Sequence, residues 1–476
     1  MKKTEKHKHN PGNSGLLEKI FSPKSIAIIG ASHEPTKIGH VVLKNFIEGG
    51  FPGALYPVNP NASEVLGIKS YKSVLDIKEK VDCAVIAVPA NVVVGVLDQC
   101  GKKGIRSAVV ITGGFGEIGN HELEMQLVAV AKKHKIAVIG PNCMGVINPS
   151  KRVDSVFLPI YKLGRPHVGE ISFISQSGAV GGCIVDLAAR AGIGMSKFVS
   201  YGNASVVNEC DLLEYLEHDK STRVIVCYLE GVKDGKRFMQ VASATTRKKP
   251  IVALKAGKSA LGAAAAKSHT GSMAGSAAAY EAAFAQTHIT EAETLDELFD
   301  FAKIFSQPLC CGKNTAVITN GGGNGVLCAD SVEKYHLGLA PFSDNTLKSL
   351  KELLPSYATV HNPLDLIGDA DAARFERAIR LCLDDTNVNS LVVNVLFQTA
   401  AIDTRIVSVL VKAHDEQKKP IIVVATGGEY TEMHRRILES YGIPTYSSPS
   451  SAVKSLSKFL EYCNHFRKHN KTACMI

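Results

Sequence analysis

Short apolar runs alternate with longer amphipathic stretches along most of the chain. Because these runs are apolar throughout, without polar positions in alternation, they predict strands buried on both faces of parallel sheets. In the first third of the chain the predicted strands are Ser25–Ile29, Ala54–Val58, Cys83–Val88, Ser107–Ile111 and Ile136–Ile139. The stretches between them predict helices at Ile38–Ile47, Val92–Gly101 and His121–His134.

Two interruptions divide this alternation into three blocks. Prolines and glycines cluster at Asn148–Pro166, and a second break falls at Gln307–Lys313. The later predicted strands are Ile171–Ile174, Lys197–Ser200, Val224–Leu229, Ile251–Leu254, Thr315–Thr319, Leu391–Leu396 and Ile421–Ala425, before a last helix at Ala452–Tyr462. We therefore predict an α/β protein of three doubly wound domains, at residues 21–148, 165–308 and 314–465. A disordered basic tail is expected at residues 1–20.

Composition and charge exclude several classes of function. Apolar runs stay short of the roughly 18 residues of a membrane span, and the N-terminus lacks an apolar signal segment. The 12 cysteines form no C-x-x-C pair, which is typical of buried thiols in a reducing compartment and argues against a metal site. The net charge of +9 is partly terminal and Trp is absent, which favours an anionic small ligand over nucleic acid. We expect a cytoplasmic protein without membrane contact.

One segment departs from the α/β pattern. Residues 256–285 are mostly Ala, Gly and Ser, with His269 as the one histidine among them. A low-complexity linker is one interpretation, but this segment lies inside a predicted domain. Small residues around an ionisable side chain also suit a loop that passes through narrow space. We expect that loop at residues 256–272, followed by an Ala-rich helix at Met273–Gln286.

Four glycine-rich stretches follow predicted strands, where parallel sheets bind their ligands. They are Gly30–Gly39, Gly140–Gly145, Ser175–Val180 and Asn320–Gly325. The first lacks G-x-G-x-x-G, and no acidic residue follows the second strand to hold a ribose diol, so a nucleotide with an extra phosphate is favoured over NAD. There, Lys37 could meet that phosphate. Backbone N–H groups at the starts of the helices after Ser175–Val180 and Asn320–Gly325 indicate anion sites.

These anion sites raise the possibility of a phosphate carried on His269. Most lone histidines are structural, but a neutral imidazole is nucleophilic near pH 7. A carboxylate bound to the far ring nitrogen would fix the tautomer and stabilise the charged product. Glu230, at the end of the strand Val224–Leu229, is well placed for that function, although a solvated or capping Glu is the alternative.

Taken together, these stretches resemble the α subunit of ADP-forming (NDP-forming) acyl-CoA synthetases, the acetate–CoA ligase relatives of succinyl-CoA ligase. The resemblance runs from about Phe21 to about Tyr462. Beyond the glycine-rich stretches, it includes Tyr56–Pro60, Ala87–Ala90, Asp211–Leu216, Ser268–Ser272 and Asn362–Leu366. It implies a Rossmann-like CoA-binding domain followed by two flavodoxin-like ligase domains.

The resemblance also implies roles for particular residues. Coenzyme A would bind at Gly30, Ala31, Ser32, Lys37, Val88, Pro89, Thr112, Gly113 and Asn142. His269 would be phosphorylated and steadied by Glu230. The phosphoryl group would be bound by two helix starts, at Ser177, Gly178 and Ala179 and at Gly322 and Gly323. The implied reaction converts acyl-CoA, phosphate and ADP reversibly to a small carboxylic acid, CoA and ATP.

Some family features are missing from the chain. Asn61 and Val206 stand where relatives commonly have Lys and Asp. No counterpart of the ATP-grasp domains and no P-loop is present, so ADP/ATP and Mg²⁺ are expected to bind through a separate β subunit, in an α2β2 heterotetramer. Two alternatives stay open: a CoA-binding regulatory protein that has lost turnover, and an NAD-dependent oxidoreductase, against which the missing acidic residue argues.

Overall fold

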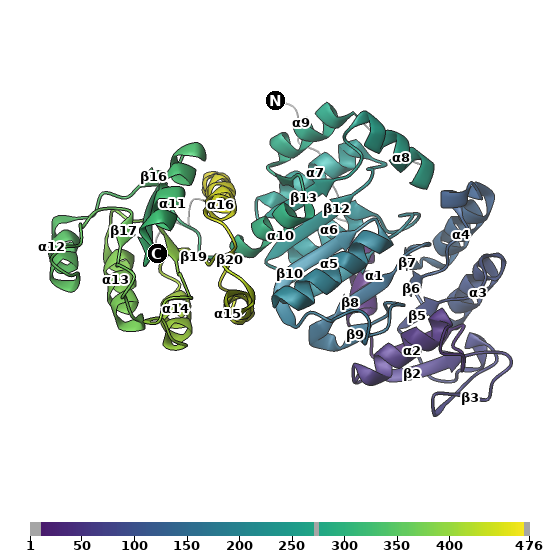
Figure 1. Ribbon diagram of the computed structural model, residues 1–476. Helices are drawn as coiled ribbons and strands as arrows, with labels where there is room; N and C mark the ends of the chain where they lie inside the picture. The colour runs from purple at the N-terminus through teal and green to yellow at the C-terminus, as the bar shows by residue number, and fades with distance from the viewer. Residues whose placement is uncertain (1–10, 271–275, 471–476) are drawn as a thin grey trace. The chain divides into compact units, whose positions relative to one another are not determined.

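A computed structural model describes residues 11–270 and 276–470 of the chain (Figure 1). Contacts divide the chain into two compact units. The first comprises residues 1–187, 195–245 and 255–287, and the second comprises residues 188–194, 246–254 and 288–476. No helix in the described ranges is long and apolar enough to cross a membrane.

The first sheet of the first unit is parallel, in the order β2-β1-β5-β6-β7. Its strands are β1 (Ser25–Ile29), β2 (Ala54–Val58), β5 (Cys83–Ile86), β6 (Ser107–Val110) and β7 (Ala137–Ile139). All five agree with the predicted runs to within two residues at each end. The helices that connect them are α2 (Ile38–Glu48), α3 (Ala90–Lys103) and α4 (His121–His134), with short elements β3 (Glu64–Val65), β4 (Ile68–Lys69), η1 (Val74–Asp76) and η2 (Gly116–Ile118). Helices α3 and α4 lie side by side (Figure 1).

The second sheet begins with β8 (Gly145–Asn148), which pairs antiparallel with β11. In the first unit its strands follow the order β12-β10-β11-β8-β9, and β10, β11 and β12 are parallel. The strands are β9 (Val153–Asp154), β10 (Val168–Ser175), β11 (Met195–Ser200) and β12 (Val224–Leu229); the helices are η3 (Pro149–Lys151), α5 (Gly178–Ala191), α6 (Glu209–His218), α7 (Gly235–Thr246), α8 (Ala260–Thr270) and α9 (Ala277–Thr287). This confirms the predicted second series of α/β elements.

The second unit contains a further parallel sheet, with the order β16-β15-β18-β19-β20 and with β17 also paired to β15. Its strands are β15 (Asn314–Thr319), β16 (Gly338–Leu339), β17 (Leu364–Asp365), β18 (Ser390–Asn394), β19 (Ile421–Val424) and β20 (Thr445–Tyr446). Its helices are α10 (Leu295–Ile304), α11 (Gly322–Lys334), α12 (Asp344–Leu353), α13 (Ala372–Asp384), α14 (Arg405–Asp415), α15 (Glu429–Ser440) and α16 (Pro449–His469). The pair β13 (Ile251–Lys255) and β14 (Thr290–Ala292) is also parallel. The mixed α/β class with parallel sheets is therefore confirmed.

Helix α1 (Pro11–Phe21) corrects the prediction of a disordered tail at residues 1–20; of that tail, residues 1–10 lie outside the described part. Leu17, Ile20 and Phe21 are buried, because their spacing places them on one face of the helix. The Ser107 hydroxyl donates to the Leu16 carbonyl oxygen (2.8 Å), which fastens α1 to the first sheet.

A second correction concerns the loop predicted at residues 256–272. Helix α8 occupies Ala260–Thr270. The segment contains a run of four alanines, and alanine has the highest helix propensity of all residue types. Ser259 caps its start by accepting from the Gly262 N–H group (3.0 Å). The helix predicted at Met273–Gln286 begins at Ala277, and residues 271–275 lie outside the described part.

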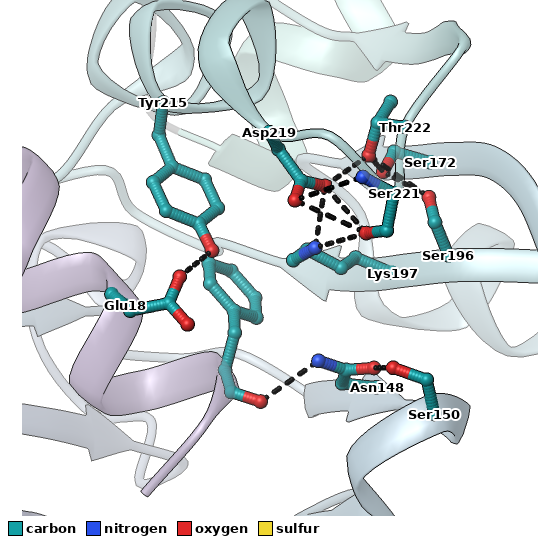
Figure 2. Close-up of polar contacts among 11 residues, drawn as sticks. Glu18, Asn148, Ser150, Ser172, Ser196, Lys197, Tyr215, Asp219, Ser221 and Thr222 are labelled. Carbon is teal, nitrogen blue, oxygen red and sulfur yellow. Dashed lines mark hydrogen bonds and ion pairs between the residues drawn. The ribbon is translucent and has the colours of Figure 1, made fainter.

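A closed polar cluster lies at the amino ends of β10, β11 and β12 (Figure 2). The Ser172, Ser196 and Thr222 hydroxyls bond to one another at 2.8 to 3.0 Å. Beside them, the ammonium of Lys197, which is 3% exposed, donates to Asp219 and to the Ser221 hydroxyl. Every group of this cluster has a partner within it, which satisfies the requirement that buried polar groups be hydrogen-bonded.

Candidate functional site

A cavity of about 1210 Å³ lies in the first unit, at the carboxyl ends of the parallel strands. It exceeds the roughly 300–1,000 Å³ typical of small-molecule sites. All nine residues predicted to bind CoA line it: Gly30, Ala31, Ser32, Lys37, Val88, Pro89, Thr112, Gly113 and Asn142. Ser177, Gly178, Ala179 and Glu230 line it too. The structure thus brings together residues that are up to 200 positions apart in the chain.

The turn between β1 and α2 forms one wall of the cavity. Gly30 has a φ of +96°, and a Cβ atom there would lie 2.2 Å from the Ala87 carbonyl oxygen, so only glycine fits. Lys37 is the N-cap of α2 and makes no side-chain capping bond. The first N–H groups of the helix can therefore face an anion. Lys37 lines the cavity, and its ammonium lies 3.8 Å from the Glu34 carboxylate.

Asn59 lies at the end of β2, where an NAD-binding domain would present a carboxylate. Its side-chain amide donates to the Ala31 carbonyl oxygen (2.7 Å) and so ties β2 to the glycine-rich turn. Because an amide occupies this position, the geometry gives no support to a ribose-diol site.

Helix α5 begins in the opposite wall of the cavity, after β10. Gln176 lines the cavity, and its side-chain oxygen accepts from the N–H groups of Glu230 (2.7 Å) and Gly231 (2.9 Å). These bonds hold the β12–α7 connection against the start of α5. The sequence analysis includes Gln176 in the stretch Ser175–Val180 but assigns its side chain no role, because these bonds form only once β10 and β12 are neighbours.

The β12–α7 connection also supplies a cation. Lys233 lines the cavity, and its ammonium donates to the carbonyl oxygens of Asn203 (2.9 Å) and Ala204 (3.3 Å). Nearby, burial lowers the pKa of Lys255, and the negative charge of Glu230 partly opposes that shift. Glu230 therefore lies within electrostatic reach of the Lys255 ammonium.

Two carboxylates that the sequence analysis did not single out also line the cavity, Glu117 and Glu124. The side-chain amide of Asn203 donates to both, at 2.6 Å and 3.0 Å respectively. Burial raises the pKa of Glu117, but the bond from Asn203 and the backbone N–H groups of Gly114 and Phe115 outweigh it and hold that pKa below its ordinary value. Glu117 is therefore an ionised acceptor at neutral pH.

Cys143 is the cysteine in the cavity wall. Burial raises the pKa of its thiol to about 12. A thiol this weakly acidic carries almost no thiolate at neutral pH, so Cys143 is no candidate nucleophile.

Val206, one of the two expected departures from the family pattern, packs against the apolar core of the first sheet. Asn61, the other departure, is exposed, and its N–H group donates to the Asn59 side chain (2.8 Å).

The lining of this cavity does not test two of the predicted sites. His269 is the penultimate residue of α8, and its side chain is outside the described part of the chain. Gly322 and Gly323 begin α11 in the second unit. A Cβ atom on Gly322 would lie 2.8 Å from Asp365 Oδ2, so a carboxylate sits beside this helix start. The roles of these residues stay predictions.

Comparison with known proteins gives three family matches along the chain. A family model described as a CoA binding domain matches residues 24–149. One described as a succinyl-CoA ligase like flavodoxin domain matches residues 168–305, and one described as a ligase-CoA domain matches residues 315–458.

Individual relatives match over nearly the whole chain. The α subunit of ADP-forming acetate–CoA ligase II from Pyrococcus furiosus is 42% identical, with 92% of this chain and 96% of that one covered. ADP-forming acetate–CoA ligase I from Archaeoglobus fulgidus is 43% identical over 94% of this chain, which spans 64% of that relative's length. The solved structure of dinucleotide-forming acetyl-coenzyme A synthetase 1 from Ca. Korarchaeum cryptofilum, in complex with phosphate and ADP, is 38% identical, with a TM-score of 0.88 and with 97% and 99% of the two chains covered.

Proposed function

The chain belongs to the ADP-forming acetate–CoA ligase family, and we propose that it is the catalytic α subunit of such an enzyme. It interconverts acyl-CoA, phosphate and ADP with a carboxylic acid, CoA and ATP. Its partner is an ATP-grasp β subunit that binds the nucleotide with Mg²⁺, and the two form an α2β2 assembly in the cytoplasm. The match to nearly the full length of a relative named as an α subunit supports a separate partner.

Coenzyme A binds in this proposal along the wall formed by the β1–α2 turn. Its phosphates meet the uncapped start of α2 and the Lys37 ammonium, which together offer N–H donors and positive charge. The loops at Val88, Thr112 and Asn142 continue the wall toward the start of α5. The thioester would then lie near the start of α5, whose residues bind phosphate in this proposal.

The chemistry runs in three balanced steps. A phosphate oxygen attacks the acyl carbon, the C–S bond breaks, and the CoA sulfur leaves and takes a proton. An imidazole nitrogen of His269 then attacks phosphorus, the bond from phosphorus to the acyl oxygen breaks, and the carboxylate leaves. Finally the phosphoryl group passes from the imidazole to ADP on the β subunit. Ser177, Gly178 and Ala179 hold the phosphate, and Glu230 stabilises the charged imidazole.

One observation carries the proposal: the nine predicted CoA residues, the start of α5 and Glu230 line a single cavity. The test mixes the full chain with its β subunit, acetyl-CoA, Mg²⁺ and radiolabelled phosphate, without ADP. We expect an acid-labile, base-stable label on this chain that ADP discharges into ATP, and no label when acetyl-CoA is omitted. An unlabelled chain that still binds CoA would favour the regulatory alternative. Acetate, branched-chain and aryl acids, compared at saturating CoA, would then define the substrate.

A further inference from the structure

Asn203, which follows β11 in the cavity wall, bonds through its side chain to three other side chains. Its amide nitrogen donates to Glu117 Oε2 (2.6 Å) and Glu124 Oε2 (3.0 Å). Its side-chain oxygen accepts from the Asn142 amide (3.2 Å), and its backbone oxygen accepts from Lys233 (2.9 Å). One residue of the second sheet thus contacts three side chains of the first α/β block and one from the β12–α7 connection.

The two carboxylates shape the loop after β6, which lines the cavity. Glu117 accepts from the N–H groups of Gly114 and Phe115, and Glu124 accepts from the N–H group of Gly116 (2.8 Å). Gly113 belongs to this loop, and a Cβ atom there would come within 3.1 Å of both the Asn142 and the Glu117 side-chain oxygens. The position of Gly113 therefore depends on how the Glu117 carboxylate is held.

Two carboxylates that approach one point repel each other, and neutral donors between them reduce that repulsion. Asn203 donates to both carboxylates, whereas the Ser205 hydroxyl donates to Glu124 (2.7 Å). The asparagine amide offers two N–H bonds for the two carboxylates and one oxygen for Asn142. Aspartate at this position would have the same shape, but it would exchange the donor for a third negative charge. The two carboxylates therefore require a neutral side chain with N–H donors at position 203, and a side chain of the same size is not sufficient.

We propose that Asn203 is a positioning residue that holds the loop at residues 113–117 in the geometry that binds CoA, and that it does so by bridging Glu117 and Glu124. This role rests on the function proposed above. In this proposal Asn203 does not contact the reacting atoms. Replacing it weakens CoA binding because the loop moves, and the loop moves because the carboxylates repel each other.

The test uses the full chain with its β subunit and compares Asn203→Asp, Glu124→Gln and the double variant. At neutral pH, Asn203→Asp should raise the KM for CoA about tenfold and leave kcat within about threefold, because three carboxylates then force the loop apart. Glu124→Gln should rescue Asn203→Asp to within about threefold of the single Glu124→Gln variant, as expected for directly coupled charges.

Asn464→Asp is the matched control, because it adds the same charge on the exposed side of α16; its KM should equal that of the wild type. An unchanged KM in Asn203→Asp would overturn the proposal, and so would a raised KM that Glu124→Gln does not restore. Calorimetric titration with CoA distinguishes failure of the proposed function from failure of this role. If the wild-type protein does not bind CoA, both are overturned. If the wild type binds CoA and Asn203→Asp binds it with the same affinity, this role alone is overturned.

Discussion

The polar side chains at the two ends of β10, β11 and β12 differ in their surroundings. At their amino ends, Lys197, Asp219 and the surrounding hydroxyls form a closed set in which each group bonds to another (Figure 2). At their carboxyl ends, the start of α5, Glu230 and Lys233 face a cavity of about 1210 Å³. Both ends belong to the same strands in the same register, so the sheet alone does not decide which end binds a ligand.

The difference teaches that access to a cavity, and not a lack of hydrogen bonds, distinguishes the two sets. The cluster at the amino ends bonds to itself and stabilises the fold. Lys233 and Asn203 are hydrogen-bonded as well, but they line the cavity. Substitutions at the two ends should therefore separate into those that cost activity and those that cost stability.

The largest expected effect is on activity, from His269→Ala. ATP formation should fall at least about a thousandfold, because the nucleophile that accepts the phosphoryl group is gone. The KM for CoA should stay within about twofold, since the predicted CoA residues belong to other elements. Steady-state assays of the α–β mixture measure both constants.

The control for this variant is His218→Ala, on the exposed side of α6, where the imidazole bonds to the Glu214 carbonyl oxygen (3.0 Å). It should retain full activity. A parallel loss of CoA affinity in His269→Ala would indicate a structural histidine and contradict the proposed role.

The next largest effect is on stability, from Lys197→Met. Removing the cation leaves the Asp219 carboxylate without its charged partner in a largely buried site, which should lower the free energy of unfolding by about 3 kcal/mol. Activity per folded molecule should not change, because the cluster lies away from the cavity lining. Urea unfolding and the assay above give the two quantities.

The double variant Lys197→Met with Asp219→Asn serves as the comparison, because it removes both charges. It should recover part of the lost stability. If it is no more stable than Lys197→Met alone, the ion pair is not the origin of the loss.

The smallest effect is the pH dependence of the same cluster. Burial raises the pKa of Asp219, but the bonds from Lys197, Thr222 and Ser221 outweigh it and hold that pKa below its ordinary value. A carboxyl whose pKa is lowered by folding adds stability above its unfolded pKa and loses that stability as the pH falls through its folded pKa. The difference in unfolding free energy between wild type and Asp219→Asn should thus persist at neutral pH and shrink below about pH 4. A difference that grows on acidification would have the wrong sign.

Much of this fold could be predicted from the sequence, because buried parallel strands are continuous apolar runs. The run Ser25–Ile29 is a strand with the predicted ends, and so is Val224–Leu229. The predictions that were wrong come from weighing composition above local propensity: α1 begins in a polar, glycine-containing stretch, and α8 contains the small residues that suggested a loop.

The cavity lining was predictable only in part. Glycine-rich turns after strands have a local signature, so Gly30 and Ser177 could be found by reading along the chain. Glu117, Glu124 and Asn203 have no such signature, because their function depends on a meeting between segments about 80 residues apart. Lys197 likewise reads as one polar residue in an apolar strand, and its partner Asp219 is set by the fold.

Helix α1 has one more consequence. Ser107 and Asp82, which it contacts, lie at the amino ends of first-sheet strands, and it also bonds to Tyr215 of α6 and Asn148 of β8. A single helix thus links the first sheet to α6 and β8 without contributing a residue to the cavity lining. Truncating α1 should therefore destabilise both sets of elements at once.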